Sequence, residues 1–278
     1  MKKSWVIIAV AVVLFVIIGM MGAKVIKNRQ AASSSFDSAP VPVKELLEQA
    51  QQYETQGDDL KVKEALAKIV SEHPDYDKIE DVQKRLGEVN VGIIFSKTPT
   101  PQAEVYQVQP GDSLGKLSKK YNTTKELIKR SNNLKSDVIR VGENLRIWKA
   151  PFSVFVSKSQ NTLVLKSNDE VVKIYHVATG KDKKNNATPA GVFKIASKIP
   201  NPVWFKAGGQ PVPPESPLNE LGSRWMGFDT DPHYGIHGTI HPEMIGENAT
   251  AGCVRMVNGD VEELFDLLPI GTKVTIQE

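Results

Sequence analysis

The distribution of apolar and polar residues divides the chain into segments of different character. After Lys2 and Lys3, residues 5–23 form an uncharged apolar run, close to the ~20 residues that cross a bilayer core as a helix. A cleavable signal has a shorter apolar core and ends in a small-x-small site, which this segment matches poorly. We therefore expect residues 1–23 to be an uncleaved membrane anchor, with a cleaved signal and secretion as the alternative.

Two different patterns follow the apolar run. Residues 24–42 are rich in alanine, serine and proline and predict a linker. Across residues 43–95, apolar residues recur at three- and four-residue spacing, which predicts a small all-α module of three helices. The positions of Tyr53, Gly57 and Pro74 resemble a tetratricopeptide-type helix pair followed by one extra helix. Such a module could bind a protein partner or act as a spacer, and the sequence favours neither.

A second linker, residues 96–103, precedes a compact unit at residues 104–149. Its β-rich ends and the capping pattern Thr123-x-x-Glu126 predict a βααβ order of elements. Four motifs add to this: Gly111-Asp112-Ser113-Leu114, Asn132-x-Leu134, Asp137-x-Ile139 and Gly142-x-x-Leu145. Together they resemble a LysM domain, a module that binds N-acetylglucosamine-containing glycans.

The LysM resemblance implies a glycan groove between two loops of the βααβ unit. The residues implied to contact glycan are Gly111, Asp112, Ser113, Leu114, Asn132 and Leu134. Residues of the first loop have an alternative role, because glycine, aspartate and serine also turn the chain and cap a helix. The sequence leaves both roles open.

Residues 150–278 predict a mostly-β domain, in which short β-rich stretches alternate with turns. Residues 261–268 form the one clear helical pattern. Residues 200–217 contain six prolines and predict a long ordered loop, which in a compact domain often serves as a lid. Trp204 could cover a substrate there, or it could pack the loop onto the core.

Charge and cysteine content narrow the chemistry. A net charge of +3 does not indicate a nucleic-acid binder. Cys253 is the only cysteine, and a lone cysteine with a histidine such as His237 is a candidate nucleophile with its base. His233, His237 and His241 have the spacing of metal ligands on a helix, but intervening prolines and glycines disfavour a helix there. We expect neither a metal nor another cofactor.

The residues around the cysteine and the histidine form a recognisable signature. It consists of His237-Gly238-Thr239, Ile245-Gly246 and Thr250-x-Gly252-Cys253-Val254-Arg255-Met256. The signature resembles that of the YkuD-type L,D-transpeptidases, which cross-link or modify bacterial peptidoglycan, and it implies a mostly-β, sandwich-like catalytic domain at residues 150–278. Ala251 stands where the family usually has a histidine, which leaves His237 as the candidate base.

This resemblance implies a thiol acyl transfer. Cys253 would attack an amide of a stem peptide, and His237 would deprotonate the thiol or form an ion pair with it. The carbonyl of Gly238 would orient the imidazole, and backbone N–H groups around Gly252 and Cys253 would stabilise the oxyanion. Substrate contacts are expected from Arg255, Thr250, Trp204 and Tyr234.

The expected protein is therefore an L,D-transpeptidase of the cell envelope that acts on peptidoglycan stem peptides and glycan strands. It would be anchored in the inner membrane, with its catalytic domain in the periplasm or cell wall. A hydrolase of the same fold, in which water replaces the acceptor amine, is an alternative that the sequence does not separate. An inactive wall-binding scaffold is a third possibility, which Ala251 favours and the retained His237, Cys253 and Arg255 oppose.

Overall fold

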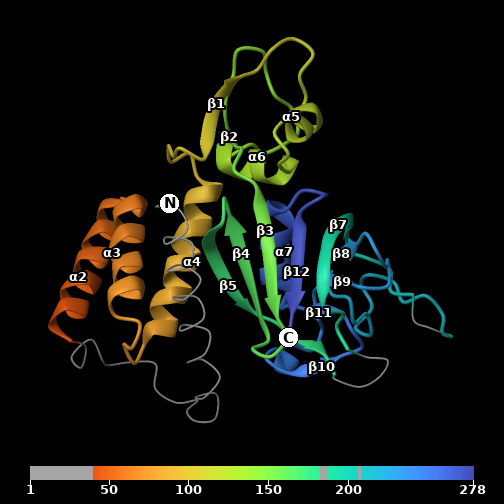
Figure 1. Cartoon of the computed structure of the whole chain (residues 1–278). Helices are drawn as coiled ribbons and strands as arrows, with labels where there is room; N and C mark the ends of the chain where they lie inside the picture. The colour runs from red at the N-terminus through yellow and green to blue at the C-terminus, as the bar shows by residue number, and fades with distance from the viewer. Residues whose placement is uncertain (1–39, 182–186, 206–207) are drawn as a thin grey trace, which may run out of the picture. The chain divides into compact units, whose positions relative to one another are not determined.

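The computed structural model describes residues 40–181, 187–205 and 208–278 (Figure 1). The chain divides into two compact units, with the boundary after Asn90. The expected membrane anchor at residues 1–23 lies outside the described residues. Within the described residues, no helix has both the length and the apolar character that crossing a bilayer requires.

The first unit is helical, as the spacing of its apolar residues predicts. Gly57, in a left-handed conformation with φ of 70°, ends its first helix, and the Asp58 side chain caps the next by accepting a hydrogen bond from the Lys61 N–H. Val43, Leu66 and their apolar neighbours are buried between the helices. The helices are α2 (Val41–Gln56), α3 (Asp59–Glu72) and α4 (Ile79–Phe95), the last of which continues past the unit boundary.

The second unit begins with the predicted βααβ arrangement. The side chains of Ser113 and Thr124 cap its two helices by accepting hydrogen bonds from backbone N–H groups three residues later. The prediction of Thr123 as the second cap was wrong by one residue, because the helix begins at Lys125 and the hydroxyl of Thr124 reaches the Leu127 N–H. Its two strands pair in an antiparallel ladder, and the helices bury Leu117 and Ile128 against them. The elements are β1 (Ala103–Gln107), α5 (Leu114–Lys120), α6 (Lys125–Asn132) and β2 (Asn144–Trp148).

The carboxy-terminal part is mostly β, as expected, and is built on an eight-stranded mixed sheet in the order β11-β9-β8-β7-β12-β3-β4-β5. The strands are β3 (Phe152–Ser157), β4 (Thr162–Ser167), β5 (Glu170–His176), β7 (Gly191–Pro200), β8 (Arg224–Phe228), β9 (Gly235–His237), β11 (Val254–Arg255) and β12 (Lys273–Gln277). A small parallel pair, β6 (Thr179–Gly180) and β10 (Asn248–Thr250), and a 3-10 turn, η1 (Pro242–Met244), lie outside this sheet. The helix predicted at residues 261–268 is α7 (Asn258–Leu267).

The βααβ unit and the β domain share part of one hydrophobic core. Leu127 of α6 and Trp148 of β2 are buried in the same cluster as residues of the eight-stranded sheet and α7. The Trp148 indole donates a hydrogen bond to the Ser167 hydroxyl at 3.2 Å. Arg130 of α6 forms an ion pair with Asp266 of α7 at 2.9 Å. The two parts are therefore docked on each other.

A substitution in this shared core should destabilise both parts together. Leu127→Ala is expected to lower the free energy of unfolding by about 2–5 kcal/mol, because it leaves a cavity in a packed interior. Hydrogen exchange should then accelerate in α7 as well as in α6. Val138→Ala, at a position of the βααβ unit that is 74% exposed, is the control and should change neither. Faster exchange confined to α6 would show that the two parts unfold independently.

Candidate active site

The pairing of two short strands brings the candidate nucleophile and base to one face of the sheet. β9 and β11 run parallel, with Val254 opposite Ile236 and Arg255 opposite His237. Cys253 directly precedes β11. Because side chains alternate along a strand, Cys253 and Arg255 project to the same side, and the register places His237 on that side too.

The turn that carries Cys253 is held by the side chains around it. The Thr250 hydroxyl donates to the Cys253 carbonyl at 2.7 Å and accepts from the Gly252 N–H at 3.2 Å. Gly252 has a φ of +117°, and a Cβ at this position would lie 2.4 Å from the ring of Tyr234. Only glycine fits there. Thr250 and Tyr234, both predicted to contact substrate, thus also shape the nucleophile turn.

His237 is 4% exposed and is held on two sides. Its Nδ1 lies 2.7 Å from the carbonyl oxygen of Gly238, the acceptor expected from the sequence. The Trp225 ring stacks against the imidazole, with centroids 5.9 Å apart and an interplanar angle of 25°. In the tautomer that suits this contact, Nδ1 carries the proton and donates it to the Gly238 carbonyl. The other ring nitrogen, Nε2, is then unprotonated and can accept a proton. Trp225 was not among the predicted site residues, because its contact arises only when β8 pairs with β9.

Cys253 and His237 make no direct hydrogen bond with each other among the described residues. The Cys253 sulfur lies 3.6 Å from the carbonyl oxygen of His233, and the Gly235 backbone also hydrogen-bonds to it. Catalytic hydrogen bonds are often loose in enzymes without substrate and tighten when the substrate binds. The arrangement is therefore compatible with proton transfer on substrate binding.

Burial sets the charge state of the pair. It raises the pKa of the Cys253 thiol to about 11. Burial, together with the charge of Arg255, lowers the pKa of His237 to about 4. At neutral pH the thiol is therefore protonated and the imidazole is neutral, which is the state in which His237 can accept a proton.

Arg255 contributes a buried positive charge beside the pair. Its side chain is 8% exposed, and its nearest carboxylate partner, Glu220, lies 3.5 Å away and is itself partly exposed. The Nε atom has no hydrogen-bond partner within the described part of the chain. A weakly paired guanidinium at this position suits the predicted role as an anchor for a substrate carboxylate.

Trp204 lies in the proline-rich loop, whose described residues are held by hydrogen bonds. The Trp204 backbone pairs with that of Val212 through two hydrogen bonds of 2.9 Å. The Asn219 amide donates to the Pro202 and Pro213 carbonyls at 2.9 and 3.1 Å. Function of the loop as a lid remains a prediction.

Residues implied to contact glycan fall into two groups. Leu114 is buried in the core of the βααβ unit. Asn132 is also buried, and its amide exchanges two hydrogen bonds of 2.7 Å with the Arg146 backbone. These two residues build the framework of the unit. Asp112 also has a framework role, because it accepts hydrogen bonds from the Tyr106 hydroxyl and the Gln109 N–H.

The other three glycan candidates remain accessible. Gly111 and Ser113 are exposed on the first loop, and Leu134 is partly exposed after α6. The histidines next to the candidate base have separate partners: the ring of His233 pairs with Asp231, and the ring of His241 pairs with Glu243. Within the described residues, no three metal-binding side chains gather.

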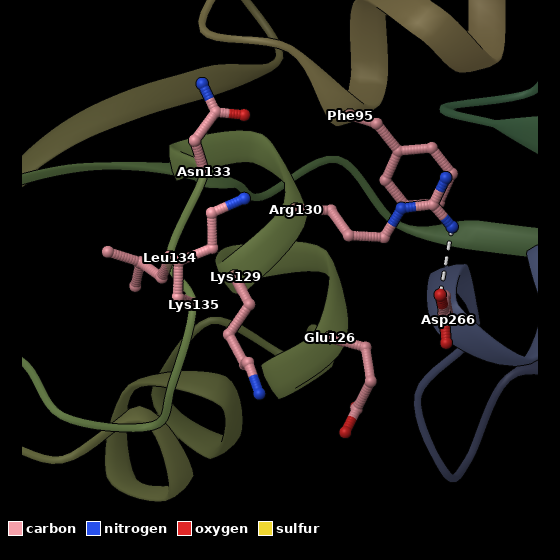
Figure 2. A pocket seen from close by; sticks show the side chains of 8 residues that line it. All are labelled: Phe95, Glu126, Lys129, Arg130, Asn133, Leu134, Lys135 and Asp266. Atoms are coloured by element: carbon pink, nitrogen blue, oxygen red, sulfur yellow. Dashed lines mark hydrogen bonds and ion pairs between the residues drawn. The ribbon is translucent and has the colours of Figure 1, made fainter.

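A pocket of about 460 Å³ lies where α6 meets α7 (Figure 2). Arg130 lies flat over the Phe95 ring, 3.4 Å from its centroid, and pairs with Asp266. The lining residues are Phe95, Glu126, Lys129, Arg130, Asn133, Leu134, Lys135 and Asp266. Since neither Cys253 nor His237 belongs to the lining, the pocket is not the chemical centre.

Comparisons with known proteins agree with this architecture. A family model for the L,D-transpeptidase catalytic domain, YkuD, matches residues 151–276, and one for the LysM domain matches residues 106–148. YkuD of Bacillus licheniformis, named as an L,D-transpeptidase, is 34% identical over 179 residues, which cover 62% of this chain and 98% of that protein. YqjB of Bacillus subtilis, named likewise, is 41% identical over 129 residues, which cover 45% and 70%.

Among solved structures, L,D-transpeptidase 3 from Mycobacterium tuberculosis is similar at a TM-score of 0.40 and 19% identity. The similarity covers 50% of this chain and 66% of that chain.

The charge state of the site can be measured directly, because Cys253 is the only thiol. The rate of alkylation by iodoacetamide should rise with pH along a curve with an apparent pKa near 11, since burial disfavours the thiolate. The reaction at pH 7 should be correspondingly slow. A plateau reached below pH 8 would contradict this result and would indicate a preformed thiolate. Denatured protein, with an ordinary cysteine pKa near 8.5, is the control.

Proposed function

This chain belongs to the L,D-transpeptidase family, and we propose that it acts on peptidoglycan stem peptides through a thioester on Cys253. The thioester would form when the sulfur displaces the terminal residue of a donor stem, and an amine of a second stem would then take the acyl group. The proposal is supported above all by the register of the β9–β11 pair, which is consistent with Cys253, His237 and Arg255 lying on one face of the sheet.

The first step is attack by sulfur with general-base assistance. Neutral His237 accepts the thiol proton as the sulfur bonds to the amide carbon, so the imidazolium exists only once the bond is forming. The Gly238 carbonyl, 2.7 Å from Nδ1, stabilises that imidazolium. The carbonyl π electrons move to oxygen and give a tetrahedral oxyanion.

The oxyanion needs hydrogen-bond donors from the nucleophile turn. The Gly252 N–H is directed to the Thr250 hydroxyl at 3.2 Å, so the turn leaves the Cys253 N–H as the donor. One such donor typically contributes a few kcal/mol in acyl transfer. When the oxyanion collapses, the carbon–nitrogen bond breaks and His237 gives its proton to the departing amine. The acceptor amine then attacks the thioester and releases the Cys253 sulfur.

The accessory parts of the chain would bring this chemistry to the polymer. The LysM domain would hold a glycan strand through the accessible loops that contain Gly111, Ser113 and Leu134. Location in the cell envelope follows from a peptidoglycan substrate. Membrane anchoring through residues 1–23 and a protein partner for the helical module remain predictions.

Replacement of the nucleophile tests the proposed reaction. Cys253→Ala should lower turnover of a soluble tetrapeptide stem by on the order of 10⁴-fold or more, the scale seen when a nucleophile is removed. Mass spectrometry of muropeptides after incubation with wild-type protein should show new cross-links or exchanged terminal residues. Trimmed stems alone would identify a hydrolase. No reaction with wild-type protein would support an inactive scaffold, and full activity of Cys253→Ala would refute the mechanism.

A substitution at Leu134, which is partly exposed and packs on the core of the βααβ unit, tests the role of the LysM domain. Leu134→Ser should weaken binding to peptidoglycan sacculi by roughly tenfold, because an apolar contact of about 1.5 kcal/mol corresponds to that factor. Turnover of a soluble tetrapeptide should not change. Val105→Ser, at a position 72% exposed on β1, is the matched control. Equal binding by both variants would remove Leu134 from the glycan site.

A further inference from the structure

Asn258, the first residue of α7, bonds to two separate backbone segments beside the active site. Its Oδ1 accepts from the N–H of Ser223 and from the N–H of Thr239, each at 3.1 Å. Ser223 directly precedes β8, and Thr239 follows β9 by two residues. One side-chain oxygen therefore ties these two segments together.

One of the two segments carries the carbonyl group that orients the His237 ring. The Gly238 carbonyl oxygen lies 2.7 Å from Nδ1 of His237. This carbonyl and the Thr239 N–H belong to the same planar peptide group, so the hydrogen bond from Thr239 to Asn258 also fixes the direction of the carbonyl. The acceptor that a ring nitrogen finds decides where the imidazole proton resides.

The glycines of these segments make room for the Asn258 oxygen. A Cβ at Gly222 would lie 2.3 Å from Asn258 Oδ1, and a Cβ at Gly238 would lie 2.2 Å from it. Both distances are far inside van der Waals contact. The backbone on both sides approaches the oxygen so closely that neither position accepts a larger residue without displacing it. The close approach and the two hydrogen bonds are thus parts of one local structure.

We propose that Asn258 is a positioning residue for the catalytic base. Its side-chain oxygen holds the Thr239 N–H, and so fixes the peptide group whose Gly238 carbonyl faces Nδ1 of His237. This carbonyl favours the Nδ1–H tautomer and leaves Nε2 free for the thiol proton. Asn258 acts through the backbone and takes no part in bond making. This inference rests on the role proposed above for His237, and it adds the element that supports that role.

The test distinguishes the effect of the Asn258 Oδ1 acceptor from that of the rest of the side chain. Asn258→Ala removes the oxygen, whereas Asn258→Asp keeps an oxygen in the same place. Nitrogen-15 NMR of the imidazole reports the tautomer without substrate, and His237→Gln assigns the signal among the five histidines. We expect Asn258→Ala to lose the single Nδ1–H tautomer and to lower kcat by on the order of 10²-fold with KM unchanged, as for a misplaced catalytic group.

Two further variants complete the design. Asn258→Asp should keep the Nδ1–H tautomer and most of kcat. Gly259→Ala, the next residue of α7, is the matched control, because a Cβ there meets nothing within 4 Å, and it should behave as wild type. If Asn258→Ala does not fold, Asn258→Ser replaces it, since a serine hydroxyl is too short to reach both N–H groups.

Two outcomes would overturn the inference. The first is an Asn258→Ala or Asn258→Ser protein that keeps the wild-type tautomer and kcat. The second is an Asn258→Asp protein that loses as much as the alanine variant, since the acceptor would then be irrelevant. The tautomer is measured in the absence of substrate, so this result stands apart from any failure of the transpeptidase assay.

Discussion

The candidate active site depends on the parallel pairing of β9 with β11, a ladder of two residue pairs. β11 is the last strand of the sheet order, and its outer side is covered where Arg255 bridges to Ala178. The Met256 N–H extends the ladder by bonding to the His237 carbonyl at 2.9 Å. A slip of one residue would turn Arg255 and Cys253 to the opposite face of the sheet. The chemistry of the site is thus fixed by backbone register before any side chain acts.

Burial at this position has an electrostatic consequence for the mechanism. It raises the pKa of Cys253 to about 11 and lowers that of His237 to about 4, so both groups are neutral across the physiological range. A protonated thiol is a weak nucleophile, and the imidazole must take its proton during the attack. In the proposed mechanism, orientation of the imidazole would therefore matter more than in a site with a preformed ion pair. The proposed role of Asn258 is to support that orientation through the Gly238 carbonyl.

The sequence predicted those features that depend on neighbours along the chain. The motifs around Cys253 and His237, the cap at Ser113 and the β-rich pattern of residues 150–278 are of this kind. Contacts that require tertiary structure were not predictable. Trp225 contacts His237 only because β8 pairs with β9. No motif or periodic pattern in the sequence indicates this contact. The core that Leu127 shares with the β domain was not predictable either. The spacing of apolar residues indicates that this leucine of α6 is buried, but it does not indicate which part of the chain it contacts.

The central claim is that Cys253 becomes acylated by a stem peptide, and intact-protein mass spectrometry tests it most directly. The protein would be mixed with a tetrapeptide donor, without an acceptor amine, and quenched after a few seconds. The account predicts a mass increase equal to the donor minus its terminal residue, located on Cys253 by peptide mapping and removed by hydroxylamine, with one equivalent of the terminal amino acid released. Release of that amino acid by a protein that carries no adduct on Cys253 at any quench time, and that still turns over after Cys253→Ala, would contradict it.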